Sequence, residues 1–135
     1  MTPVPNISPA TPVPHCAIRV REVDANTVVV AADGELDLAS APELKWTILE
    51  WFEKGHRRVV VDLSGVSFID STAIGVLIAI ARKLRDGQRL ALGGVGPAIR
   101  DVFRLAGVER AFRLYPTGQA STAYLEAIGT GRETW

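Results

Sequence analysis

The chain has 135 residues, the size of one domain that can bury a hydrophobic core without disulfides. Its 15 Lys and Arg residues balance its 15 Asp and Glu residues, so the net charge does not indicate nucleic acid or an anionic membrane as a partner. The single cysteine, Cys16, excludes an internal disulfide and fits a reducing cytosol. There is no run of 18 apolar residues and no secretory signal pattern at the N-terminus. We therefore expect a cytoplasmic protein that binds neither nucleic acid nor membrane.

The balance of charges conceals an asymmetry along the chain. Residues 1–70 carry six Lys or Arg and ten Asp or Glu, a difference of −4. Residues 71–135 carry nine and five, a difference of +4. Solvated faces are the simpler interpretation of this division, and association with a partner is the alternative.

The N-terminal third of the chain predicts a tail and two strands. Residues 1–14 contain five prolines and no charged side chain, which is typical of an extended or disordered tail. Residues 17–23 alternate between apolar and charged side chains, and residues 28–32 are continuously apolar, so we expect a half-exposed strand followed by a buried one. The turn composition of residues 24–27 favours a hairpin, and Gly34 permits a backbone kink or a bulge after it.

Residues 40–54 have the pattern of an amphipathic helix. Ser40 and Glu43 have the spacing of a capping box, and Pro42 lies in the first turn, where a missing N–H does little harm. Gly55 suits the position that follows a helix end. One stripe of this helix is apolar and should face the core: Leu44, Ile48, Trp51 and Phe52.

The middle of the chain predicts a buried strand at residues 58–63, a loop at residues 64–69 and a helix from Thr72 to Leu84. Asp70 and Ser71 then fall where the loop enters the helix. Side-chain oxygens of such residues cap helix starts by accepting from unpaired N–H groups, and the positive end of the helix dipole also tolerates a phosphate. On local grounds the cap is the simpler interpretation.

The helix at residues 72–84 is apolar on nearly every side, so it is either buried on both sides or meets a partner. The core spacing is followed by Ile74, Leu77, Ile78, Ala81 and Leu84. A second side is formed by Val76, Ala79, Ile80 and Lys83, which we interpret either as further packing within the domain or as a docking face beside Ser71.

The remaining segments predict a strand at residues 88–93, a helix at residues 97–106, a short strand at residues 111–115 and a helix at residues 117–128. Strands that alternate with helices imply right-handed crossovers between parallel strands. We therefore predict an α/β fold with a mixed, mostly parallel sheet of four to five strands and about four helices.

The sequence offers little catalytic chemistry. It contains no Walker-type loop, and Ser71 has neither a GxSxG setting nor a histidine partner. Gly94 and Gly96 match part of a dinucleotide fingerprint; a tight turn explains them, and a small-ligand or nucleotide site at residues 93–96 is the alternative.

Three acidic residues offer a metal site as an alternative. Asp37, Asp62 and Asp70 could meet at the carboxyl ends of strands and bind Mg²⁺, although turn and cap roles explain them more simply. We expect no enzyme activity, no cofactor and no metal.

Four short motifs occur in order along the chain. They are residues 34–37 (GELD), 41–44 (APEL), 61–64 (VDLS) and 68–75 (FIDSTAIG). Together they resemble the STAS domain over roughly residues 15–128, and most closely the bacterial anti-sigma factor antagonists. The resemblance implies a domain at 15–128 between a proline-rich tail at 1–14 and a frayed end at 129–135.

The resemblance implies a switch without catalytic activity. In that family the first hydroxyl residue of the Asp-Ser-[Ser/Thr]-[Gly/Ala] motif accepts a phosphate, and this residue corresponds to Ser71. The implied partner is an anti-sigma factor that is also a serine kinase of the histidine-kinase-like ATPase type. The unphosphorylated antagonist binds this kinase and frees the sigma factor, and a phosphoserine phosphatase restores that form. One departure is Ala73, where many members have glycine.

We expect the chain to be a monomer or a weak dimer. The alternative function is that of a non-phosphorylated STAS scaffold subunit within a larger signalling or lipid-transport assembly, in which Ser71 only caps a helix. The partner-binding surface that we predict consists of Asp37, Asp70, Ser71, Thr72, Val76, Ala79, Ile80 and Lys83.

Overall fold

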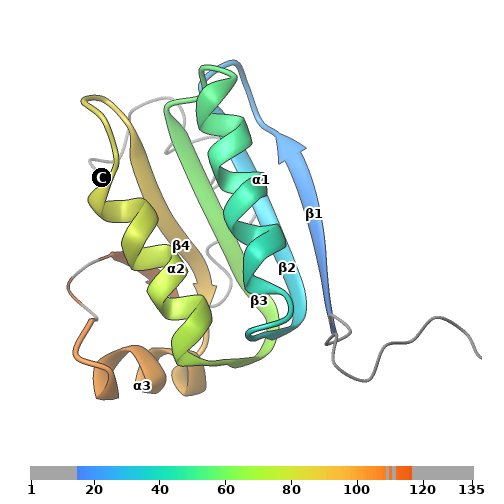
Figure 1. Cartoon of the computed structure of the whole chain (residues 1–135), viewed down its shortest axis with the longest axis vertical. Helices are drawn as coiled ribbons and strands as arrows, with labels where there is room; N and C mark the ends of the chain where they lie inside the picture. Colours follow the sequence, from blue (N-terminus) through green and yellow to red (C-terminus); the bar gives the residue numbers. More distant parts are fainter. Residues whose placement is uncertain (1–14, 109, 111, 117–135) are drawn as a thin grey trace, which may run out of the picture.

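A five-stranded sheet forms one layer of the protein in the computed structural model, which describes residues 15–108, 110 and 112–116 (Figure 1). The strands lie in the sheet in the order in which they occur in the chain. The first strand is antiparallel to the second, and all other neighbours are parallel, so the predicted mixed sheet is confirmed. The strands are β1 (Cys16–Glu22), β2 (Thr27–Leu36), β3 (Arg58–Ile69), β4 (Arg89–Val95) and β5 (Arg113–Pro116).

Helices α1 (Ala41–Glu53) and α2 (Ser71–Arg82) lie side by side over one face of the sheet (Figure 1). Helix α3 (Pro97–Leu105) lies near the end where α2 begins. The predicted tail at 1–14, the helix at 117–128 and the frayed end at 129–135 fall outside the described residues. None of the described helices is both long and apolar enough to cross a membrane.

The core lies between the sheet and the two helices. Alternate residues of the central strands point toward the helices and pack with buried leucine and isoleucine side chains of α1 and α2. The residues between them on these strands, Val29, Val60 and Ala91, point to the opposite face and are also buried. Burial on both faces is characteristic of parallel strands and explains their continuous apolar runs. The residues that face the helices are Val28, Val30, Val59, Val61, Leu90 and Leu92.

Strand β3 is longer than predicted. Residues 64–69, expected to form a loop, continue the strand and pair with the second half of β2. This pairing has two register shifts, one opposite Ala31 and Asp33 and one opposite Gly34 and Glu35, and at each of them β3 contributes one residue more than β2. The kink or bulge predicted at Gly34 is present as a kink: its φ is 116°, and a Cβ there would collide with the His15 carbonyl oxygen, whereas the extra residue at this shift, Ser67, lies in β3.

The capping box predicted at the start of α1 is wrong, although the helix begins where expected. Ser40 is at the N-cap position, but its side chain makes no cap hydrogen bond. Its hydroxyl instead donates to the Glu35 carbonyl oxygen at 2.8 Å and accepts from the Asp37 N–H at 3.0 Å. The buried serine therefore fastens the β2–α1 loop to the end of β2.

The buried side of α2 differs from the predicted stripe. Ile80, which we assigned to a docking face, is only 3% exposed and packs in the core, so this assignment is wrong. Ile78 and Ala81, predicted as core residues, are half-buried at its margin. Ala79 and Lys83 are exposed, as a docking face requires. The buried side consists of Ala73, Ile74, Leu77 and Ile80.

Gly94 is explained by packing between strands. Its φ is 67°, and a Cβ at this position would come within 2.7 Å of both the Asp62 Oδ1 atom and the Ser64 backbone nitrogen. A glycine is therefore needed where β4 approaches β3. This packing accounts for Gly94 without a nucleotide or small-ligand site at residues 93–96.

The thiol of Cys16 should react slowly. Burial raises the pKa of this thiol above its ordinary value, the negative charges of Asp33, Glu43 and Asp37 add to the rise, and a hydrogen bond with the Asp33 backbone opposes it. Since the thiolate is the reactive form, we expect slower reaction with a disulfide reagent than free cysteine shows at about pH 7.5. The urea-unfolded chain, measured the same way, should react at the rate of free cysteine. A native rate equal to the unfolded rate would contradict this.

Candidate functional site

Two segments of the chain meet at the edge of the sheet where β2 and β3 end. Leu36 and Ile69, the last residues of these parallel strands, are paired in register, so Asp37 and Asp70 leave the sheet side by side. The Asp70 N–H donates to the Leu36 carbonyl oxygen at 3.0 Å, which ties the two exits together. The β2–α1 loop therefore lies beside the start of α2.

Of the two predicted cap candidates, Asp70 and Ser71, it is Asp70 that caps helix α2. Its backbone is extended (φ −110°, ψ 178°), and its carboxylate Oδ1 accepts from the Ala73 N–H at 3.0 Å. Its carbonyl oxygen accepts the first α-helical bond, from the Ile74 N–H at 3.1 Å. This leaves the N–H groups of Ser71 and Thr72, which have no partner within the helix.

Ser71 is the first residue of α2 and is exposed. Within the described part of the chain, no residue forms a hydrogen bond with its hydroxyl. The hydroxyl is thus accessible at the positive end of the helix dipole, beside two N–H groups, where a phosphate is electrostatically tolerated. Thr72, the next residue, is also exposed.

The Asp37 carboxylate holds the β2–α1 loop in shape. Its Oδ1 atom accepts from the N–H groups of Ala39 at 3.0 Å and Ser40 at 3.2 Å. These bonds present the loop residue between them, Leu38, whose side chain is 65% exposed. Asp37 therefore determines how Leu38 is exposed at the protein surface, because it fixes the conformation of the loop.

Two exposed apolar residues at this edge were not predicted from the sequence. Leu38 lies in the β2–α1 loop, and Phe68, which is 50% exposed, lies two residues before the capping Asp70. The only sequence signal for Leu38 was a large apolar residue between the turn-forming Asp37 and Ser40. Phe68 begins the 68–75 motif, but the sequence did not indicate that its side chain is exposed, because its strand was predicted to be a loop.

The other predicted docking residues extend along α2. Val76 is half-buried, whereas Ala79 and Lys83 are exposed. Lys83 lies twelve residues beyond Ser71, which at 1.5 Å per residue is about 18 Å along the helix. The site around Ser71 therefore includes the first half of α2, and Lys83 belongs to the opposite end.

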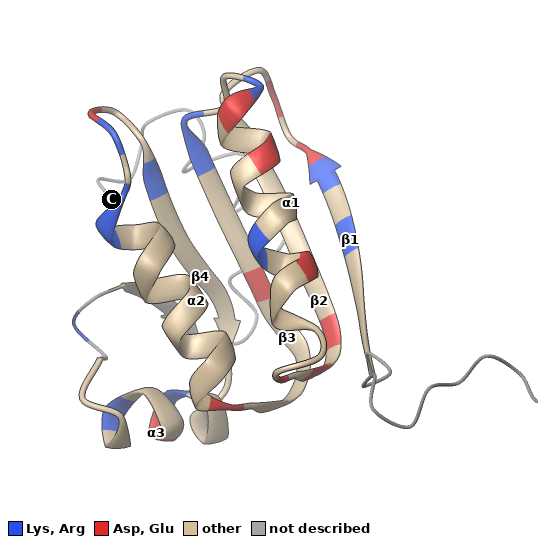
Figure 2. Ribbon diagram, viewed as in Figure 1, with Lys and Arg blue, Asp and Glu red and all other residues tan. Residues whose placement is uncertain are grey.

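Acidic residues gather at the edge of the sheet around Ser71. Glu35, Asp37 and Asp70 lie at or next to the ends of β2 and β3, whereas the opposite end of the molecule carries both basic and acidic residues (Figure 2). Helix α3 brings cationic residues to the Ser71 end, and one of them, Arg104, is paired with Asp101 on the same helix at 2.8 Å. A phosphate on Ser71 would therefore add negative charge to an edge that is already acidic.

The acidic residues do not form a metal site. Asp62 lies within β3, where its Oδ1 accepts from the Ser64 N–H at 2.9 Å and the Ser64 hydroxyl at 2.7 Å. Asp37 and Asp70 are engaged in the loop and the cap. Among the residues that the structure describes, no group of three or more His, Cys, Asp or Glu side chains could hold a metal ion. The Mg²⁺ alternative therefore has no support in the structure.

Removal of the cap should destabilise the protein. We expect Asp70→Ala to lower the free energy of unfolding by about 1 kcal/mol, because it removes the acceptor of the Ala73 N–H. Asp70→Asn keeps an oxygen at the same place and should cost much less, so the pair separates the hydrogen bond from the charge. Urea unfolding measures both. Equal losses for the two variants would show that the charge, and not the cap, is responsible.

Comparisons with known proteins agree with this geometry. The STAS domain family matches residues 17–120. The anti-sigma-F factor antagonist RsfB of Mycobacterium tuberculosis is 31% identical over 102 residues, which is 75% of this chain and 84% of RsfB. The crystal structure of an anti-sigma factor antagonist from Mycobacterium paratuberculosis superposes with a TM-score of 0.71 at 30% identity, over 82% of this chain and 94% of that one.

A third relative has been solved in two covalent states. The anti-sigma factor antagonist SpoIIAA in its unphosphorylated form superposes with a TM-score of 0.68 at 25% identity, over 88% of this chain and 99% of SpoIIAA. Its phosphorylated form, from Bacillus, superposes with a TM-score of 0.62 at 25% identity, over 86% of this chain and 100% of that one. This chain therefore belongs to the STAS domain family, and the three relatives described above are anti-sigma factor antagonists.

Proposed function

We propose that this protein is an anti-sigma factor antagonist controlled by phosphorylation of Ser71. The unphosphorylated form binds a cytoplasmic anti-sigma factor that is also a serine kinase, and this binding releases the sigma factor. The observation that carries the proposal is the accessible Ser71 hydroxyl, placed at the start of α2 directly after the capping Asp70. The names of the relatives support the regulatory role, and the two solved forms of SpoIIAA support a phosphorylation switch.

The surface that binds the kinase, which we term the switch surface, surrounds Ser71. It joins the β2–α1 loop, the end of β3 and the first half of α2, and it omits the buried Ile80 and the distant Lys83. Its two large exposed apolar side chains suit a protein interface, where such residues act as anchors. The switch surface comprises Asp37, Leu38, Phe68, Asp70, Ser71, Thr72, Val76 and Ala79.

Phosphorylation acts on the interface and leaves the fold intact. A phosphate adds a charge of about −1.5 to −2, which a helix start accommodates. In the complex, the same group would have to be buried beside Asp37 and Asp70, at the cost of dehydrating a dianion and of repulsion between like charges. The chain itself supplies no catalytic residue: ATP and Mg²⁺ bind to the kinase, and a phosphoserine phosphatase restores the binding form.

A comparison of three tagged baits in a lysate of the organism that encodes this chain tests the proposal. The baits are the wild type, Ser71→Asp and the uncharged Ser71→Asn, and captured proteins are identified by mass spectrometry. We expect a histidine-kinase-like anti-sigma factor with the wild type, retained in part by Ser71→Asn and lost with Ser71→Asp. If all three baits captured the same non-kinase proteins, Ser71 would have no switching role and the scaffold function would replace ours.

Truncation of an apolar anchor should weaken the complex without affecting the fold. Because Phe68 is half-exposed, Phe68→Ala should lower affinity for the captured kinase about tenfold, or about 1.4 kcal/mol. Leu105→Ala is the matched control, since Leu105 is 83% exposed on α3 and lies outside the switch surface. Calorimetric titration measures both variants. Equal affinities for Phe68→Ala and the wild type would remove Phe68 from the interface.

A further inference from the structure

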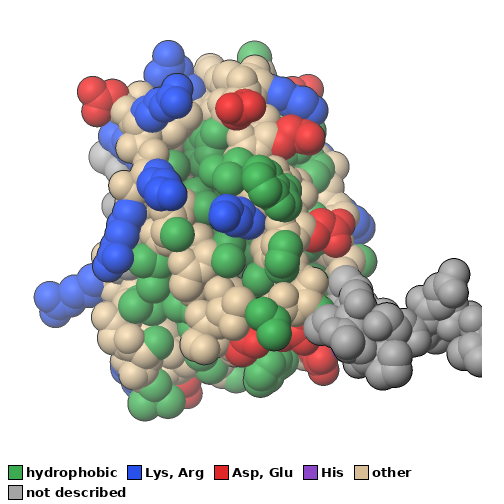
Figure 3. Space-filling model, viewed as in Figure 1, with side chains coloured by type: hydrophobic (Ala, Val, Ile, Leu, Met, Phe, Trp, Pro, Cys, Tyr) green, Lys and Arg blue, Asp and Glu red, His purple; other side chains and the backbone are tan. Residues whose placement is uncertain are grey.

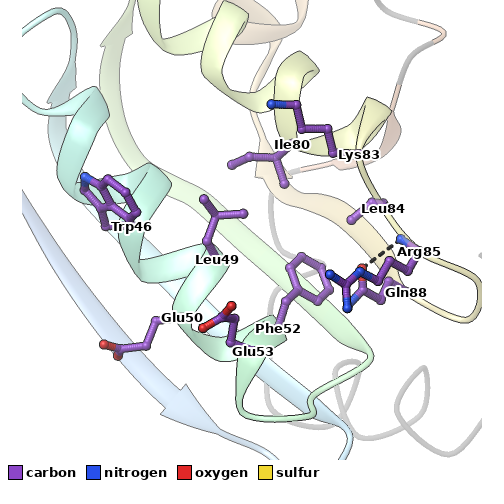
Figure 4. Close-up of a pocket in the computed structure, with 10 residues that line it drawn as sticks. All are labelled: Trp46, Leu49, Glu50, Phe52, Glu53, Ile80, Lys83, Leu84, Arg85 and Gln88. Carbon is purple, nitrogen blue, oxygen red and sulfur yellow. Dashed lines mark hydrogen bonds between the residues drawn. The ribbon is translucent and has the colours of Figure 1, made fainter.

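A groove of about 490 Å³ runs between α1 and α2 on the side away from the sheet (Figure 4). Its floor is apolar and comes from both helices: Leu49, Phe52, Ile80 and Leu84. Trp46 borders the groove with its side chain 67% exposed. The space-filling view shows hydrophobic side chains gathered over this face of the molecule (Figure 3). An exposed tryptophan beside an apolar groove is typical of an interface.

The two walls of the groove carry opposite charges. Glu50 and Glu53 line it from α1, whereas Lys83 and Arg85 line it from the end of α2 (Figure 4). Glu50 is within 3.5 Å of Lys54, its neighbour on the same helix. For Glu53, Lys83 and Arg85, the described part of the chain contains no ion-pair partner. One acidic and two basic groups thus border the groove unpaired.

Because of the direction of the two helices, the acidic wall of the groove in one copy can face the basic wall in a second copy. Helix α1 connects the parallel strands β2 and β3, and helix α2 connects the parallel strands β3 and β4, so the two helices point in the same direction (Figure 1). Their charged C-terminal ends therefore lie at the same end of the groove. A two-fold axis along the groove would lay α1 of one copy over α2 of the other with both pointing in the same direction. Glu50 and Glu53 of each copy would then face Lys83 and Arg85 of the other.

The same arrangement provides a place for the tryptophan. Trp46 precedes Glu53 by seven residues, and Val76 precedes Lys83 by seven, so Trp46 would lie over this part of the other copy's α2. The exposed residues on either side, Gly75 and Ala79, are small and leave room for an indole ring. We propose that a second copy of this chain occupies the groove, forming a two-fold dimer through α1 and α2.

Dimerisation would restrict access to part of the switch surface. Val76 and Ala79 belong both to the switch surface and to the dimer face, so a copy held in the dimer cannot present them to a kinase. The dimer itself requires only the purified chain and no phosphate on Ser71. Its test is therefore independent of the proposed function.

Sedimentation velocity of the full chain, from about 5 μM to about 500 μM, tests the dimer. We expect the weight-average sedimentation coefficient of the wild type to rise with concentration, and Trp46→Ala to weaken dimerisation at least tenfold. Glu53→Lys and Lys83→Glu should each weaken it, because each places like charges opposite one another. The double variant Glu53→Lys/Lys83→Glu should recover most of the wild-type affinity. Leu105→Ala, which truncates an exposed leucine outside the groove, should change nothing.

Three outcomes would overturn the proposal. One is a wild type that sediments as a monomer at every concentration. Another is a Trp46→Ala variant that dimerises like the wild type while circular dichroism shows both to be folded. The third is a double charge variant that associates no better than the single variants, which would place any self-association on another surface.

Discussion

Replacement of Ser71 by aspartate is expected to weaken binding of the anti-sigma kinase by a factor on the order of a hundred, while leaving the fold unchanged. The new carboxylate would lie at an interface that already contains Asp37 and Asp70, and it would have to be dehydrated in the complex. In the free protein the same charge lies at a helix start, where it is accommodated. Calorimetric titration of the captured kinase gives the affinity, and urea unfolding gives the stability.

Two further variants isolate the effect of charge. Ser71→Ala should bind as the wild type does and be unable to accept a phosphate. Ser71→Asn has nearly the shape of aspartate without its charge, so it should lose only a small part of the affinity. An unchanged affinity for Ser71→Asp would contradict the electrostatic switch, and equal losses for Asn and Asp would assign the effect to size.

Truncation of Leu77 should have the largest effect on stability. This α2 residue is fully buried in the core between the sheet and the helices, so Leu77→Ala leaves a cavity and should cost about 2–5 kcal/mol of unfolding free energy. Leu105→Ala makes the same chemical change at an 83% exposed helix position and should stay within about 0.5 kcal/mol of the wild type.

Urea unfolding of both leucine variants measures this difference, with equal slopes confirming that the folded state is retained. A loss below about 1 kcal/mol for Leu77→Ala would mean that α2 is not packed on the sheet as described. Because α2 carries Ser71 at its first position, that result would also place the geometry of the switch surface in question.

The central strands and the helix α1 were predictable because their local patterns agree with their tertiary environment. The run Val59–Val61 is apolar at every position, as a strand buried on both faces must be, and the structure places it at the centre of the sheet. Leu44, Ile48 and Phe52 recur at helical spacing and are all buried.

The predictions that were wrong concern features that depend on contacts between distant segments. Residues 64–69 contain serine and glycine, which locally favour a loop, and they form an irregular strand only because the end of β2 is available for pairing. Ser40 has two competing hydrogen-bond roles, and the geometry of the loop decides for the Glu35 carbonyl oxygen over the helix N–H groups. Helix α2 is apolar almost throughout, so its sequence has too little contrast to indicate that Ile80 faces the core.

Some residues of the candidate site could likewise be predicted from the sequence, and others could not. Asp70 could be recognised as a cap because Asp is suited to that role at a helix start, and the structure confirms the bond to the Ala73 N–H. Leu38 and Phe68 could not be found, since the exposure of a large apolar side chain depends on what the rest of the fold leaves uncovered. That Ser71 accepts a phosphate is a prediction from the family resemblance and from its accessible position.

The most direct test is to incubate the purified chain with the captured kinase and Mg²⁺-ATP, and to locate any phosphate by tandem mass spectrometry. The proposed function predicts a single phosphate on Ser71, none on the Ser71→Ala variant, and dissociation of the phosphorylated chain from the kinase. A phosphate on Thr72 instead, or a Ser71 phosphoprotein that stays bound to the kinase, would contradict it.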